Sequence, residues 1–189
     1  IWFTLLALSG CVRLFDLGFQ NLVIIFSAHS RKKGAEQVSV TFRSSREYHN
    51  ILLSIFGPIV FLIGFFVLRN VAQDLYIQWV IYFFSMALYS RALLHISFLE
   101  GQGHVFLTYV VRGCGYIAQS ILVIVFLNTN HGLNSLIYSS IIVNITLLLL
   151  AIYLNRKSKN PWSQYQQAAI RQQYSKYFAL HKLTVVTSV

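Results

Sequence analysis

Long apolar runs alternate with short polar segments along the whole chain. Five of these runs are long enough to cross a bilayer, which requires about 20 mostly apolar residues. The predicted membrane spans cover residues 1–28, 51–68, 76–96, 105–127 and 133–154. The connections between the later spans are short, which favours antiparallel neighbours. The pattern therefore predicts an all-α membrane protein, a polytopic bundle with five transmembrane helices.

The basic residues predict how this bundle is oriented. They concentrate in a polar loop expected over 29–50 and in the tail 155–189. Loops rich in Lys and Arg stay in the cytoplasm. Four crossings separate the two segments, so they share one side, and the N-terminal end of the chain is expected outside. From Pro161 the tail has the spacing of an amphipathic helix on the cytoplasmic membrane face, with a solvated linker as the alternative.

Both ends of the chain are apolar. The sequence opens at Ile1, directly in an apolar run, and residues 184–189 become apolar again. We interpret the chain as an internal or truncated piece of a longer protein, with one helix missing upstream.

Composition and motifs exclude several classes of function. Charged residues make up 11% of the chain, against roughly 25% in soluble domains, and the net charge is +10. The basic residues flank apolar runs, so they do not indicate a nucleic-acid partner. Cys11 and Cys114 lie inside apolar segments without metal-ligand spacing, and no cofactor is expected. Neither a paired-carboxylate arrangement nor a phosphate-binding glycine loop occurs, so we do not expect an enzyme.

Polar side chains inside the first predicted span are the first candidate functional residues. A charge inside a bilayer is costly and usually faces a bundle interior or a wet cavity. Arg13, Asp16 and Gln20 recur at helical spacing, which places them on one face. A lumen explains this stripe, whereas an Arg13–Asp16 pair that only fixes helix packing is the alternative.

Two further arginines lie inside later spans. Arg91 is near the end of its span, where a long side chain can also reach the headgroups. His95 follows one turn later on the same face, and the two side chains could bind a phosphate or sense protons. Arg112 lies about two turns into its span, which favours a position in a lumen. We predict that Arg13, Asp16, Gln20, Arg91, His95 and Arg112 bind the substrate.

Three segments resemble one family of transporters. The stretch 2–26, centred on Leu14-Phe15-Asp16-Leu17-Gly18-Phe19, resembles the second helix of Wzx-type polysaccharide flippases. These belong to the multidrug/oligosaccharidyl-lipid/polysaccharide exporter superfamily. Residues 99–103 and 130–133 are similar to the glycine-bearing loops before the fifth and sixth helices of that family. The resemblance covers most of 1–153 as family helices two to six, the N-terminal half of a V-shaped transporter.

The resemblance implies a function and partners. It implies a transporter in the inner membrane of a bacterium, with a central cavity and alternating access. Its cargo would be polyprenyl-pyrophosphate-linked oligosaccharide units for O-antigen or capsule synthesis. Cationic side chains would complement the pyrophosphate, with Asp16 positioning Arg13. The lipid bilayer surrounds the bundle, and a polysaccharide polymerase and a chain-length regulator are further expected partners.

Three rival interpretations remain. A drug/cation antiporter of the same superfamily would favour acidic residues in the lumen. A membrane-embedded glycan polymerase or acyltransferase would show a large external loop or an intramembrane His/Asp pair. A membrane scaffold that transports nothing would tolerate the loss of all three arginines.

Overall fold

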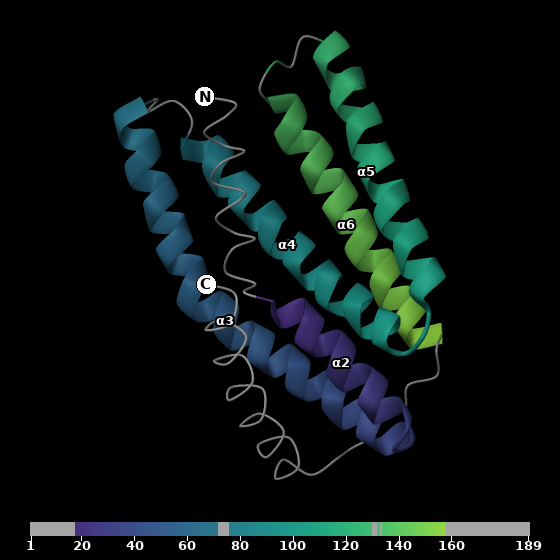
Figure 1. The fold of residues 1–189 in the computed structure, drawn as a ribbon. Helices are drawn as coiled ribbons and strands as arrows, with labels where there is room; N and C mark the ends of the chain where they lie inside the picture. The colour runs from purple at the N-terminus through teal and green to yellow at the C-terminus, as the bar shows by residue number, and fades with distance from the viewer. Residues whose placement is uncertain (1–17, 72–75, 130–131, 133, 158–189) are drawn as a thin grey trace.

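The computed structural model describes residues 18–71, 76–129, 132 and 134–157. Five helices make up nearly all of this part of the chain (Figure 1), and it contains no strand. They are α2 (Phe19–Arg31), α3 (Ala35–Val71), α4 (Tyr76–Gly101), α5 (Val105–Asn128) and α6 (Asn134–Lys157). The four helices after α2 are long and apolar enough to cross a membrane. The all-α, multi-pass prediction is confirmed for these residues.

Helix α4 is the centre of the bundle. It packs against each of the other four described helices, whereas α3 packs only on α2 and α4 among them. Helices α5 and α6 lie side by side on the other side of α4 (Figure 1). The result is two helical groups, α2 with α3 and α5 with α6, that share α4 as a common wall.

The polar segment between the first two predicted spans is not a loop. Helix α3 begins at Ala35, so the loop prediction was wrong for 35–50. No glycine or proline interrupts the sequence between Ala35 and Phe56. Buried Val38, Phe42 and His49 recur at helical spacing and face α2 and α4. The tertiary contacts of this apolar side, together with the missing helix breakers, explain why a polar segment continues as a helix.

Helix α2 is a short helix that begins inside the first predicted span. Gly18 has a backbone φ of 79°, in the left-handed region that favours glycine, and α2 starts at Phe19. With 13 residues, α2 cannot cross a bilayer alone. The part of the predicted span before Gly18 lies outside the described residues, as does the tail 158–189.

Small residues allow close helix contacts at two points of the α4 interface. A Cβ atom on Gly101 would overlap the carbonyl oxygen of Ile24. In α3, Gly64 lies directly against the indole of Trp79, whose Nε1 donates to the carbonyl of Phe61 at 3.2 Å. These contacts fix α2 and α3 against opposite ends of α4.

The outer surface of α5 and of the second half of α3 is apolar. Large exposed side chains there include Phe66, Phe106, Ile117 and Ile124. Such a continuous apolar surface suits contact with lipid rather than with water. The α2–α3 turn, the α4–α5 turn and the end of α6 lie at one common end of the bundle (Figure 1).

Candidate functional site

Arg91 lies in α4 beside three other basic or titratable side chains. His95 is one turn further along α4, and His49 and Arg46 are one turn apart on α3. Arg91 is within electrostatic reach of the other three, and His95 is within reach of both Arg46 and His49. The Oγ of Ser90 contacts Nε2 of His49 at 3.4 Å, which joins the two helices at this level. We call these four residues the arginine–histidine cluster.

His95 is fixed in this cluster by contacts from two helices. Asn155 of α6 contacts its Nδ1 with Nδ2 at 3.1 Å and donates to its backbone carbonyl at 3.1 Å. The ring of Phe42 lies 5.1 Å from the imidazole, centroid to centroid. His95 and His49 are both buried. The histidines are therefore part of the packed wall, and the arginines are the more exposed members.

The cluster lies near the middle of the bundle. The hydroxyl groups of Tyr89 and Tyr116 are 3.1 Å apart, so Tyr89 is level with the centre of α5. Arg91 is about half a turn from Tyr89, or roughly 3 Å along the axis. The apolar stretch of α5 has its centre at this level, whereas the apolar side of α3 begins only beyond it, at Ile55, so the cluster lies between the middle and the basic edge of the part able to cross a membrane.

No acidic side chain neutralises the cluster within the described part of the chain. The ion pairs there join Arg43 to Glu47 and Arg112 to Glu100, and neither involves Arg46 or Arg91. The two arginines repel each other instead. A net positive charge at bilayer depth is costly unless water or an anion compensates it.

The side of α3 next to this cluster is polar. Its exposed or half-buried polar residues fall on one side of the helix: Glu36, Ser39, Arg43, Arg46, Glu47, Asn50 and Ser54. This series starts at the basic end of the bundle and passes the level of the cluster. Beyond it, from Ile55 to Phe66, the exposed side of α3 is mainly apolar. The two halves of α3 thus suit different surroundings, water for the first and lipid for the second.

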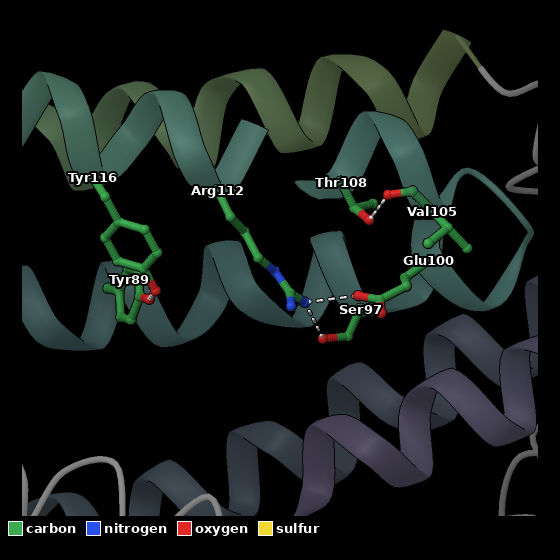
Figure 2. Close-up of polar contacts among 7 residues, drawn as sticks. All are labelled: Tyr89, Ser97, Glu100, Val105, Thr108, Arg112 and Tyr116. Carbon is green, nitrogen blue, oxygen red and sulfur yellow. Dashed lines mark hydrogen bonds and ion pairs between the residues drawn. The ribbon is translucent and has the colours of Figure 1, made fainter. Parts of the chain in front are cut away.

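Arg112 has a different environment. From α5 its Nη2 reaches Oε2 of Glu100 at 3.0 Å and Oγ of Ser97 at 3.4 Å, both on α4 (Figure 2). The Arg112 and Glu100 side chains are only 23% and 13% exposed. The 3.0 Å contact is an ion pair without hydrogen-bond geometry at Oε2, and Nε of Arg112 is buried without an acceptor. The charge of Arg112 is nevertheless balanced inside the protein.

The structure separates Arg91 from Arg112. At about 100° per residue, Arg91 and Glu100 fall on opposite sides of α4. The arginine–histidine cluster faces α3 and α6, whereas the Arg112–Glu100 pair lies between α4 and α5. One small ligand cannot contact both arginines in this arrangement.

The remaining predicted site residues lie at the N-terminal end. Arg13 and Asp16 are outside the described residues. Gln20 is half-buried in the first turn of α2, next to Phe19, whose ring stacks on His49 at 5.9 Å. Gln20 is therefore on the helix that borders the cluster.

Sequence reasoning missed Arg46, His49 and Glu100. Arg46 and His49 were assigned to a loop, although the helical spacing of Val38, Phe42 and His49 could have placed them on a helix. Glu100 was assigned to the turn before Val105. No local signal pairs Glu100 with Arg112, because the pairing depends on how α4 and α5 pack.

Comparison with protein-family models, with curated protein sequences and with solved structures finds no match to this chain.

Proposed function

We propose that this chain is the N-terminal half of an inner-membrane flippase that translocates polyprenyl-pyrophosphate-linked oligosaccharides for surface polysaccharide synthesis. The observation that carries the proposal is the arginine–histidine cluster, which lies within helices able to cross a membrane. It has net positive charge, no acidic partner among the described residues, and a polar helix side leading to it. An anionic group that enters the membrane region together with a lipid tail suits this environment.

Arginine suits the pyrophosphate chemically. A guanidinium is planar, stays charged, and can donate two parallel hydrogen bonds to one phosphate. In the proposed complex Arg91 and Arg46 contact the pyrophosphate, and His49 and His95 shape the wall behind them. The lipid tail remains against the apolar surface of the helices. Arg112 has its charge balanced by Glu100 and is assigned the weaker role.

The antiporter alternative is less suited to these residues. An organic cation requires an unbalanced carboxylate at bilayer depth. Among the described residues, Glu47 and Glu100 are each paired with an arginine, and Glu36 is exposed at the start of α3. The proposed bundle has its basic end in the cytoplasm, following the distribution of Lys and Arg.

The test is complementation of a bacterial strain that lacks its own repeat-unit flippase. The chain, within the reading frame that encodes it, is produced as the parent and as Arg91→Ala, Arg46→Ala and Arg43→Ala. We expect the first two changes to reduce surface polysaccharide and to accumulate lipid-linked units inside, at unchanged protein level. Arg43 is the matched control, since it is exposed and already paired with Glu47. If the parent exports polysaccharide and both cluster variants export as much, the assignment of the site is refuted. If the parent exports nothing, the flippase proposal is refuted.

A further inference from the structure

Two turns are joined at the basic end of the bundle. The side chain of Gln102, in the α4–α5 turn, donates to the backbone carbonyl and to the hydroxyl of Ser27 at 2.9 and 2.8 Å. The guanidinium of Arg31, at the end of α2, lies directly against Gly103, which has a φ of 92°. A side chain at position 103 would displace the Arg31 guanidinium from this place. The α2–α3 and α4–α5 turns therefore form one surface.

The first part of this surface is basic. Arg31, Lys32 and Lys33 are consecutive and exposed, and none of them forms an ion pair within the described residues. Lys33 is held in the turn by a backbone hydrogen bond to the carbonyl of Ser30 at 2.9 Å, and Gly34 provides the positive φ that lets α3 begin. Three positive charges are thus presented close together by an ordered turn.

The second part of the surface is apolar and begins immediately beside the first. Val105, Phe106 and Leu107 open α5 and are all exposed, Phe106 to 83%. Gly103, against which Arg31 lies, is only two residues before Val105, where this apolar surface begins. A ligand that fits both parts has a negatively charged head and a hydrocarbon chain. A free phosphate would use only the basic part.

We propose that this surface binds the headgroup of an anionic glycerophospholipid from the adjoining leaflet. The phosphate contacts Arg31, Lys32 and Lys33, while the acyl chains lie along Phe106 and the exposed side of α5. The level of the turns supports this occupant, because the apolar helices α4 and α6 end there and the apolar helix α5 begins there. Clusters of Lys and Arg at such a boundary attract anionic lipids. This site does not depend on the proposed cargo.

The test measures binding of fluorescent phosphatidylglycerol to the full chain in neutral detergent, with phosphatidylcholine as the uncharged comparison. Each basic residue near an anionic headgroup strengthens binding roughly fivefold. We expect Lys32→Gln to weaken phosphatidylglycerol binding by about that factor, and the triple change R31Q/K32Q/K33Q to weaken it about a hundredfold. Binding of phosphatidylcholine should not change.

Controls separate the site from general charge and from misfolding. Arg43→Gln removes one exposed positive charge elsewhere and should bind phosphatidylglycerol like the parent. Lys32→Gln changes one exposed side chain and keeps Arg31 on Gly103, so it reports on the site even if the triple variant unfolds. Parent-like binding by Lys32→Gln, or full displacement of the lipid by inorganic phosphate at matched ionic strength, would overturn the proposal.

Discussion

The arginines at the two faces of α4 differ in whether their charge is balanced. On the α5 face, Arg112 is matched by the carboxylate of Glu100 at 3.0 Å and by the hydroxyl of Ser97. On the α3 face, Arg91 has Arg46 as its charged neighbour and no acid among the described residues. Both sites lie within helices able to cross a membrane. The first satisfies its own charge, and the second leaves a positive charge to be satisfied from outside.

This difference separates a structural role from a binding role. Removing one member of a buried ion pair leaves the other charge uncompensated, so the protein loses stability. Removing one of two like charges relieves their repulsion, so it should weaken ligand binding without lowering the stability of the fold. A change at Arg112 should therefore affect stability more than ligand binding, and a change at Arg91 should affect ligand binding more than stability.

The largest effect is expected on the stability of the α5 face. Arg112→Ala leaves Glu100 buried without its partner and should lower the free energy of unfolding by about 3 kcal/mol. The double change Arg112→Leu with Glu100→Leu removes both charges and should cost much less. Unfolding of the purified chain in detergent micelles, followed by helical circular dichroism, measures both. Equal losses in the single and double variants would show that the charge pair is not what stabilises this interface.

On the α3 face, the larger effect is expected on ligand binding. A hydrogen bond to a charged group contributes about 1.5–3 kcal/mol, so Arg91→Ala should weaken binding of a polyprenyl pyrophosphate roughly tenfold to a hundredfold. Its stability should match or exceed that of the parent, because the repulsion from Arg46 is removed. Titration of the purified variants with the sugar-free lipid tests this. A variant that binds normally but unfolds easily would place Arg91 in the same class as Arg112.

Water should reach the α3 face and not the exposed face of α5. After Cys11 and Cys114 are changed to Ser, single cysteines at Ser54 and at Ile117 report on the two faces. Thiols react as thiolates, which form in water and not in hydrocarbon. We expect a charged, membrane-impermeant thiol reagent to modify Ser54→Cys about tenfold faster than Ile117→Cys in reconstituted vesicles. Equal rates would remove the contrast between a wet face and a lipid face.

The sequence predicted the helical class and the later spans, because a bilayer imposes a length of apolar residues that can be counted. The structure has helices at 76–101, 105–128 and 134–157, where spans were predicted at 76–96, 105–127 and 133–154. The first half of α3 was missed because its charges resemble a loop. Its apolar side becomes meaningful only when α2 and α4 pack against it.

The candidate site was predictable only one residue at a time. A charge inside an apolar run is visible in the sequence, so Arg91 and Arg112 were found. Whether each has a partner depends on contacts between helices. His49 meets Ser90 across 41 residues of sequence, and the level of Arg91 along α5 follows from the Tyr89–Tyr116 contact. Periodicity within one helix carries no information about these pairings.

The smallest expected effects come from the hydroxyl contacts that join α4 to α5 and to α3. Tyr116→Phe removes the Tyr89–Tyr116 contact, and Ser90→Ala removes the contact to His49. A hydrogen bond between membrane helices contributes about 0.6 kcal/mol on average, so each change should lower the free energy of unfolding by about that amount. Only Ser90→Ala alters the wall of the arginine–histidine cluster, so it alone should also change lipid binding, about twofold. If Tyr116→Phe weakened polyprenyl pyrophosphate binding as much as Ser90→Ala, the ligand would have to contact both faces of α4, and their separation would fail.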